Sequence, residues 1–178
     1  MSDTHTSKLL SLVLRHKPDE IGIALDNAGW VDVDTLLAAL ASHGHALTRD
    51  ELDHLVASND KRRFEYNANG TRIRAAQGHS IPVDLELPPK EPPAILYHGT
   101  ADRFLAQIRK TGLQKRDRQH VHLSPSPDLA TTVGQRHGRP ITLQVRAGDM
   151  HRTGHQFFLS SNNVWLTDHV PAEFIDFP

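Results

Sequence analysis

Cysteine is absent from this sequence of 178 residues. Its absence excludes disulfides, a thiolate nucleophile and cysteine-ligated zinc. The sequence also lacks a run of roughly 18 apolar residues, which excludes a membrane-spanning helix on length. The first residues have neither the basic start nor the apolar run of a secretory signal, and we therefore expect a cytoplasmic protein.

An excess of either charge is missing as well. The chain has 20 Lys+Arg and 21 Asp+Glu, a formal net charge of -1, which gives no support for nucleic-acid binding. The basic residues are unevenly placed, however, and gather between Lys61 and Arg74 and again between Arg103 and Arg118. Because such clusters are more often solvated faces than binding sites, they permit RNA binding without predicting it.

Several catalytic motifs do not occur. There is no Gly-x-Ser-x-Gly elbow, no Gly-x-x-x-x-Gly-Lys phosphate loop and no His-Glu-x-x-His. The pairs His43-x-His45 and His120-x-His122 could each place two imidazoles on one strand face. No carboxylate triad accompanies them, and a chain with 13 His contains such pairs by chance. We therefore expect no metal site.

Prolines divide the chain into two lobes. Residues 81–93 contain Pro82, Pro88, Pro89, Pro92 and Pro93. This segment can sustain neither a helix nor a central strand, and it predicts an extended linker. The expected domains are an N-terminal lobe of residues 1–80 and a C-terminal lobe of residues 94–178.

The N-terminal lobe has helical patterns followed by a hairpin. An apolar run from Leu9 to Leu14 predicts a buried helix that Pro18 stops. Asp32 or Asp34 can cap a second helix that ends near Gly44.

A capping box at residues 48–51 begins a third helix. Residues 64–66 and 71–73 then alternate around Asn69-Gly70, a strong hairpin signal. Helices followed by a two-stranded hairpin look like a winged helix, although a fold alone does not establish a function.

The C-terminal lobe alternates short apolar segments with helices. The predicted strands are Ala94–Tyr97, Val121–Leu123, Ile141–Val145, Phe157–Leu159 and Val164–Leu166. One helix is expected from about Asp102 to Lys110 with Gly112 as its stop, and another from Pro127 to near Gly138. The fold class is therefore α+β, with a small mixed sheet in this lobe.

Two short segments could carry chemistry. Arg15-His16 follows an apolar helical run, where a guanidinium beside an imidazole suits a dianionic phosphate and a proton transfer; a solvated helix end is the alternative. Residues 97–100, Tyr-His-Gly-Thr, are expected where a strand ends and a helix begins. That junction could offer a glycine turn, a helix N-terminus for a phosphate and a His98 donor for a sugar hydroxyl; the alternative is a turn with a capping threonine.

Taken together, several blocks occur in an order that resembles the RNA 2′-phosphotransferase family, the KptA type in bacteria. They begin with Ser7-Lys8-x-Leu10-Ser11-x-x-Leu14-Arg15-His16-x-Pro18, Asn59-Asp60-Lys61-x-Arg63-Phe64 and Ile73-Arg74-Ala75-x-Gln77-Gly78-His79-Ser80. They continue with Leu96-Tyr97-His98-Gly99-Thr100, Gly112-Leu113, His120-Val121-His122-Leu123-Ser124, Val133-Gly134-x-Arg136 and Ser161-Asn162-x-Val164-Trp165-Leu166. The resemblance runs from about residue 7 to residue 175.

This resemblance implies a winged-helix lobe and an ADP-ribosyltransferase-type lobe that holds NAD⁺ as co-substrate. The implied substrate is an RNA with an internal 2′-phosphate, as left by tRNA splicing. The phosphate attacks C1″ of the nicotinamide ribose and gives a 2′-phospho-ADP-ribosylated RNA. The 2″-hydroxyl then releases 2′-hydroxyl RNA and ADP-ribose 1″,2″-cyclic phosphate. We expect a monomer.

The resemblance also assigns site residues. Those implied in catalysis are Arg15, His16, Arg63 and Arg136. Those implied in NAD⁺ binding are His98, Gly99, Thr100, Gly112, Leu113, His122, Leu123 and Ser124. Spacing alone does not show that the three arginines converge, and Arg63 and Arg136 could each be ordinary surface residues.

Three other functions remain open. A protein ADP-ribosyltransferase would often place a glutamate near a late strand, and residues 162–165 contain no acid. A winged-helix RNA-binding protein without enzymatic activity would leave the blocks at residues 97–100 and 120–124 without a purpose. ADP-ribose transfer to a terminal nucleic-acid phosphate would stop after the first step.

Overall fold

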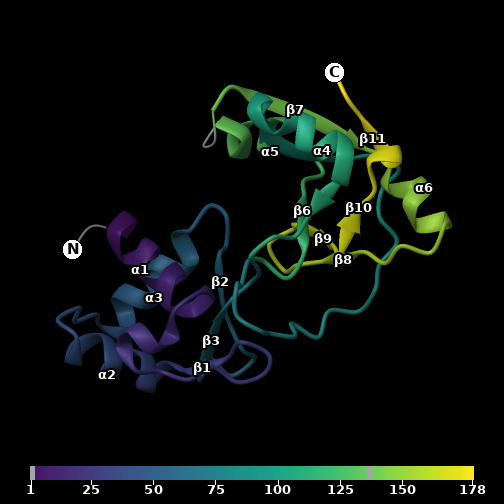
Figure 1. Ribbon diagram of the computed structural model, residues 1–178. Helices are drawn as coiled ribbons and strands as arrows, with labels where there is room; N and C mark the ends of the chain where they lie inside the picture. The colour runs from purple at the N-terminus through teal and green to yellow at the C-terminus, as the bar shows by residue number, and fades with distance from the viewer. Residues whose placement is uncertain (1–2, 136–137) are drawn as a thin grey trace. The chain divides into compact units, whose positions relative to one another are not determined.

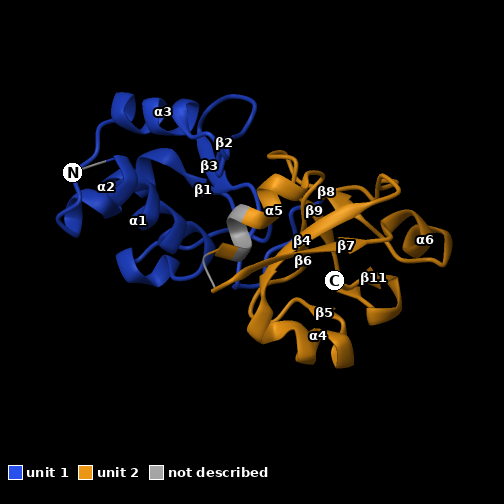
Figure 2. Cartoon of the chain, turned by 90° about the horizontal axis from the view of Figure 1, so that it is seen from above, with its two compact units in different colours: residues 1–86 blue, residues 87–178 orange. Residues whose placement is uncertain are grey.

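The chain forms two compact units, residues 1–86 and residues 87–178 (Figure 2). The computed structural model describes residues 3–135 and 138–178. The division between Glu86 and Leu87 falls within the predicted linker. Residues 81–93, all of them described, form no helix or strand, but backbone hydrogen bonds hold them to the two units. The Asp84 N–H donates to Asn27 O in the first unit, and the Lys90 N–H donates to Phe157 O in the second, each over 2.8 Å.

The first unit packs helices to one side of a small antiparallel sheet (Figure 1). Its elements are α1 (Asp3–Arg15), η1 (Pro18–Ile21), β1 (Val31–Asp32), α2 (Val33–Ser42), α3 (Arg49–Ser58), β2 (Phe64–Tyr66) and β3 (Arg72–Ala75). The sheet has the order β1-β3-β2. The core beneath it is mainly aliphatic and includes Leu10, Val13, Leu14, Leu36, Leu40, Leu52, Phe64 and Ile73.

Local signals place the ends of these helices. α1 ends at Arg15, before Pro18, and the N–H groups of His16 and Lys17 both donate to Leu12 O. Asp32, not Asp34, caps α2, because its side chain accepts from the Asp34 N–H. The predicted capping box is confirmed, since Thr48 Oγ1 accepts from the Glu51 N–H and Glu51 Oε1 from the Thr48 N–H.

The predicted hairpin is confirmed as β2 and β3, with Phe64 opposite Ala75. In its turn, Asn67 Oδ1 accepts from the N–H groups of Thr71 and Arg72, and Gly70 has a φ of 71°. The two-residue strand β1 then extends the sheet by pairing Val31 with Ile73. The sequence did not predict β1, because a strand this short has no period of its own.

The second unit is built from short antiparallel sheets. Its elements are β4 (Leu96–Ala101), η2 (Asp102–Phe104), α4 (Leu105–Thr111), β5 (Leu113–Gln114), β6 (Val121–Leu123), α5 (Pro127–Gly134), β7 (Pro140–Val145), α6 (Ala147–Arg152), β8 (Phe158–Leu159), β9 (Trp165–Thr167), β10 (His169–Val170), η4 (Ala172–Phe174) and β11 (Ile175–Asp176). The sheet orders are β11-β7-β4, β6-β9-β8 and β10-β5. Helix α5 packs against β4 and β7. The whole chain is therefore α+β, as predicted.

Two predictions for this unit need correction. The strand predicted to end at Tyr97 continues to Ala101, because six consecutive residues of β4 pair with β7. His98, Gly99 and Thr100 therefore lie inside a strand rather than at a strand-to-helix junction, and no helix begins there to receive a phosphate. The helix expected near residues 102–110 is divided into η2 and α4, although Gly112 does follow its end.

No helix in residues 3–135 and 138–178 is both long and apolar enough to cross a membrane.

We expect Thr48→Ala to lower the free energy of unfolding by about 1 kcal/mol, because it removes the side-chain half of the capping box. Urea unfolding measures the change. Thr48→Ser, which keeps the hydroxyl, should stay near wild type. Thr35→Ala, at an exposed position inside α2, is the matched control and should not lower stability. Equal losses in Thr35→Ala and Thr48→Ala would contradict the assignment.

Candidate functional site

Arg15 and His16 lie together at the C-terminal end of α1. Arg15 is buried, with 9% of its surface exposed, whereas His16 is half-buried. A buried guanidinium beside an accessible imidazole keeps positive charge at a fixed place and leaves a group for proton transfer at the surface. This is the arrangement that a phosphate-binding site requires.

The segment Ala76–Ser80 connects these residues to Arg63. At one end, the Ala76 N–H donates to Arg63 O over 2.8 Å. At the other end, the Ser80 N–H donates to Arg15 O over 3.0 Å. Because so short a segment holds both carbonyls, three of the four predicted catalytic residues are anchored in one part of the first unit. The fourth, Arg136, lies outside the described residues.

Ser80 also holds the ring of His16. Its Oγ lies 2.7 Å from His16 Nδ1, a normal hydrogen-bond distance. Ser80 lies in one of the family motifs, but its role could not be predicted from the sequence, because no local pattern indicates a contact across 64 residues.

His79 is buried beside these charges, with 3% of its surface exposed. Burial, the largest cause, and the nearby charges of Arg15, Arg74 and His16 together lower the pKa of His79 from 6.5 to about 4. Its Nε2 has no hydrogen-bond partner among the described residues. His79 is therefore neutral near pH 7 and adds no competing charge beside Arg15.

The other arginines of the basic segment are used within the fold. Arg72 pairs with Asp26 over 2.9 Å, and Arg74 pairs with Glu65 over 2.7 Å. The Arg74 guanidinium also lies 4.3 Å from the centre of the Trp30 ring. Arg63, by contrast, opens the hairpin beside Asn59, whose Oδ1 accepts from the Arg63 N–H. Arg72 and Arg74 thus serve the fold, and Arg63 is a candidate ligand for an anion.

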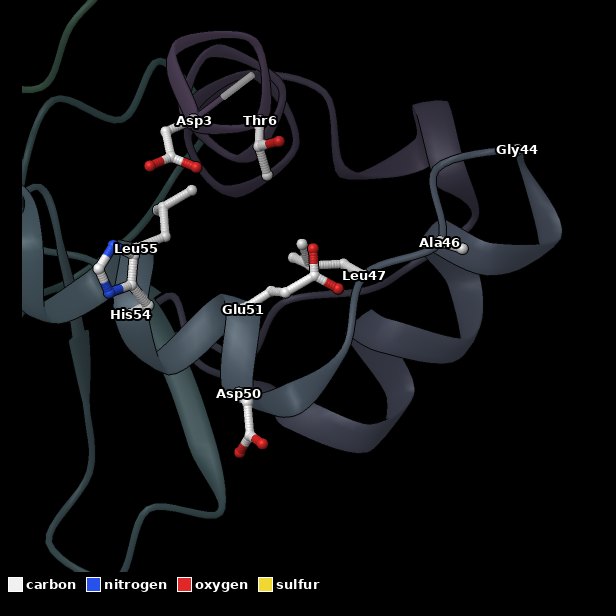
Figure 3. Close-up of a pocket in the computed structure, with 9 residues that line it drawn as sticks. All are labelled: Asp3, Thr6, Gly44, Ala46, Leu47, Asp50, Glu51, His54 and Leu55. Atoms are coloured by element: carbon white, nitrogen blue, oxygen red, sulfur yellow. The ribbon is translucent and has the colours of Figure 1, made fainter. Parts of the chain in front are cut away.

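A hollow of about 530 Å³ in the same unit is a poor candidate for a phosphate site (Figure 3). It lies between the start of α1, the α2–α3 loop and α3, and its lining includes the acids Asp3, Asp50 and Glu51. Three carboxylates would repel a phosphate. Asp3 is also separated from Arg15 by nearly the whole of α1, roughly 18 Å at 1.5 Å per residue.

In the second unit, the predicted NAD⁺ residues of β4 and β6 lie side by side. Tyr97 and Ser124 exchange two backbone hydrogen bonds of 2.8 Å. His98 Nδ1 lies 2.9 Å from His122 O, and since a carbonyl can only accept, Nδ1 carries the proton. The contact fixes the orientation of the His98 ring against β6.

Arg118 joins this group, and sequence reasoning missed it. Its Nη1 lies 3.4 Å from His122 Nδ1, and a guanidinium can only donate. At the two contacts, His98 Nδ1 thus acts as donor and His122 Nδ1 as acceptor. The sequence showed that basic residues gather between Arg103 and Arg118, but nothing in the composition of this segment marked Arg118 as a functional residue.

The remaining predicted NAD⁺ residues have structural environments. The side chains of Thr100, Leu113 and Leu123 are buried, and Gly99 is buried within β4. The side chains of Leu113 and Leu123 belong to the core of this unit, so these two residues could contact a ligand only through the backbone.

Gly112 ends α4 with a φ of 73°, and a Cβ there would lie 2.1 Å from Val170 O. Close packing against β10 is sufficient to explain this glycine.

The family motif that begins at Ser161 lies mostly in a tight turn, because residues 160–164 connect β8 and β9. The Ser160 N–H donates to Val164 O, and Ser160 Oγ accepts from the Val164 N–H. The sequence of this turn contains no glutamate to bind a ribose hydroxyl. Among residues 3–135 and 138–178, no group of three or more His, Asp or Glu side chains is placed to hold a metal ion.

Comparison with known proteins gives the same family across nearly the whole chain. The family model described as RNA 2'-phosphotransferase, Tpt1 / KptA family, matches residues 1–169. A "Probable RNA 2'-phosphotransferase" of Streptomyces coelicolor is 57% identical over 97% of this chain and 93% of its own length. A protein of the same name in Burkholderia pseudomallei is 54% identical over 98% of this chain and 95% of its own length. Another in Rhodopirellula baltica is 53% identical over 97% of this chain and 95% of its own length.

Similarity of this extent places the chain among the transferases. It belongs to the RNA 2′-phosphotransferase, Tpt1/KptA family, which confirms the resemblance found in the sequence.

The buried His79 should make stability depend on pH. Between pH 6.5 and about 4 the unfolded chain binds a proton at this residue that the folded chain does not, so the free energy of unfolding decreases as the pH falls through this range. The full shift corresponds to roughly 3 kcal/mol. Urea unfolding at several pH values should show a shallower dependence in His79→Gln, whereas His54→Gln, at an exposed position, should keep the wild-type dependence. An unchanged dependence in His79→Gln would refute the assignment.

Removing the Ser80 hydroxyl should impair His16 without unfolding the protein. We expect Ser80→Ala to lower kcat about tenfold, the loss of roughly one hydrogen bond, and to shift the pH–rate profile. Ser80→Thr should restore the profile. Ser42→Ala, which removes an exposed hydroxyl at the end of α2, is the control. A wild-type pH profile in Ser80→Ala would exclude a positioning role.

Proposed function

We propose that this chain is an NAD⁺-dependent RNA 2′-phosphotransferase that removes an internal 2′-phosphate from RNA by transfer to ADP-ribose. The observation that carries the proposal is the hydrogen-bonded segment Ala76–Ser80, which anchors Arg15, His16 and Arg63 in one part of the first unit. Membership of the family supports it. The first unit would act as a winged-helix phosphate-binding domain and the second as an ADP-ribosyltransferase-type domain.

The first step mainly requires orientation. An RNA 2′-phosphate is already an anion and needs no base to become a nucleophile. NAD⁺, as co-substrate, supplies an electrophilic C1″ with nicotinamide as the leaving group. A phosphate oxygen forms the bond to C1″ while the bond to nicotinamide breaks. Arg15 and Arg63 hold the phosphate in line for this attack, and holding two reactants in register removes much of the entropic barrier.

The second step requires stabilisation of charge. The ribose 2″-hydroxyl attacks phosphorus, and the bond from phosphorus to the RNA O2′ breaks. Negative charge increases on the phosphoryl oxygens, where fixed guanidinium groups lower the barrier. The 2″-hydroxyl loses a proton and the departing O2′ takes one up, and His16, whose ring Ser80 orients, is suited to accept the first and supply the second. Arg136 is the fourth residue of the proposed catalytic set.

For NAD⁺ itself, we assign the binding role to His98, Thr100, His122 and Ser124 and to the backbone near Leu113. The backbone pairing of Tyr97 with Ser124, which places these segments side by side, supports this assignment. Arg118 adds a cation beside His122, where the diphosphate of NAD⁺ would be attracted.

The two steps predict a distinctive mutant. Arg63→Ala should slow the second step more than the first, so 2′-phospho-ADP-ribosylated RNA should accumulate in a single-turnover reaction. The same result is expected for Arg136→Ala. Arg62→Ala, at the adjacent exposed position, and His43→Ala should react like wild type. Wild-type rates in Arg63→Ala would contradict its catalytic assignment.

A single assay tests the proposed function. A short RNA with one labelled internal 2′-phosphate is incubated with the full chain, with and without NAD⁺. We expect release of the label as ADP-ribose 1″,2″-cyclic phosphate only when NAD⁺ is present. Release without NAD⁺, or no release by folded protein, would overturn the proposal. Labelled protein in a parallel reaction with labelled NAD⁺ and protein acceptors would instead indicate a protein ADP-ribosyltransferase.

A further inference from the structure

An exposed basic surface lies on the second unit, outside the group formed by His98, His122 and Ser124. Its centre is the half-buried ring of Phe104, at the end of η2. The Arg103 guanidinium lies 4.7 Å from the centre of this ring, and the Arg116 guanidinium lies 5.2 Å from it. Two arginines that are 13 positions apart in the sequence thus meet at one aromatic side chain. We call these three residues the Phe104 surface.

The electrostatics of the Phe104 surface favour an anion. Within residues 3–135 and 138–178, no carboxylate forms an ion pair with Arg103 or Arg116. Both side chains are exposed. Two guanidinium groups at one ring repel each other, and an anion bound between them relieves that repulsion. The neighbouring Lys115 differs, because its Nζ is paired with Asp168 over 2.6 Å.

The backbone supports the same interpretation. Arg116 has a φ of 52°, a left-handed conformation that costs free energy in a residue with a Cβ. It lies in a turn closed by the hydrogen bond from the Arg118 N–H to Lys115 O. A glycine or asparagine would relieve the strain at position 116 but would lose the guanidinium. The arginine at this position thus keeps a guanidinium beside Phe104 at a cost in backbone strain.

We propose that the Phe104 surface binds the RNA backbone, as a second contact with the substrate made by residues other than those proposed to hold the 2′-phosphate. Guanidinium groups match phosphate oxygens, and an aromatic ring flanked by cations suits the alternating phosphates and bases of a flexible strand. The inference rests on the proposed function, because it presumes that the substrate is an RNA longer than the reacting junction. It adds a site that recognises the length of the RNA rather than the phosphate that reacts.

The test compares two substrates with the same internal 2′-phosphate, a trinucleotide and a tRNA-sized RNA. In the double variant Arg103→Gln/Arg116→Gln, KM for the long RNA should rise about tenfold. KM for the trinucleotide, KM for NAD⁺ and kcat should stay at wild-type values. The plot of log affinity for the long RNA against log salt should become shallower by roughly 1.4 to 1.8, since each phosphate contact contributes about 0.7 to 0.9.

The matched control is Lys90→Gln/Arg152→Gln, which removes the same charge from exposed positions elsewhere in the second unit. It should leave both substrates unaffected. An unchanged KM for the long RNA in the Arg103/Arg116 variant would overturn the proposal. Equal losses on both substrates would also overturn it, by placing the arginines at the reacting junction.

Failure of the proposed function would look different. In that case the wild-type chain would release no product from either RNA. Fluorescence anisotropy with the long RNA still tests the Phe104 surface, because it needs neither NAD⁺ nor turnover. Weaker binding and a shallower salt dependence in the double variant are expected there, and binding equal to wild type would contradict the surface.

Discussion

The hydrogen bonds at the two ends of Ala76–Ser80 are the constraint on which the proposed phosphate site depends. Arg15 belongs to a helix at the start of the chain, and Arg63 belongs to a hairpin. Neither element alone would hold the two arginines in register. The segment binds Arg63 O at one end and Arg15 O at the other, and Ser80 then fixes the His16 ring. One short stretch thereby ties the end of α1 to the start of the hairpin.

Arginines that bind a phosphate must not be neutralised by carboxylates of the protein. Arg72 and Arg74 are neutralised by Asp26 and Glu65, so they support the sheet without attracting the substrate. Burial keeps His79 neutral beside Arg15. The fold thus separates the arginines that hold the structure together from those that are proposed to bind phosphate. The proposed reaction needs such arginines, because its substrate is an anion before it reacts.

The sequence predicted what local chemistry determines. The box at Thr48, the turn after Asn67 and the stop before Pro18 each follow from a few neighbouring residues. Strands such as β1 and β10 were missed, because two residues have no period and are defined by their partners. β4 continues past Tyr97 because residues 98–101 pair with β7, a partner that lies far along the chain. Ser80 contacts His16, and Arg118 contacts His122, only after distant or irregular segments of the chain have packed together. The family motifs therefore did not predict these two contacts.

The most direct test of this account is the affinity for RNA in the absence of NAD⁺. Two RNAs of identical sequence, one with an internal 2′-phosphate and one with a 2′-hydroxyl, are titrated into the full chain. A phosphate held by Arg15, His16 and Arg63 predicts that the phosphorylated RNA binds at least about tenfold more tightly, an advantage worth about 1.4 kcal/mol. Equal affinity for the two RNAs would contradict the central claim that these residues form a 2′-phosphate site.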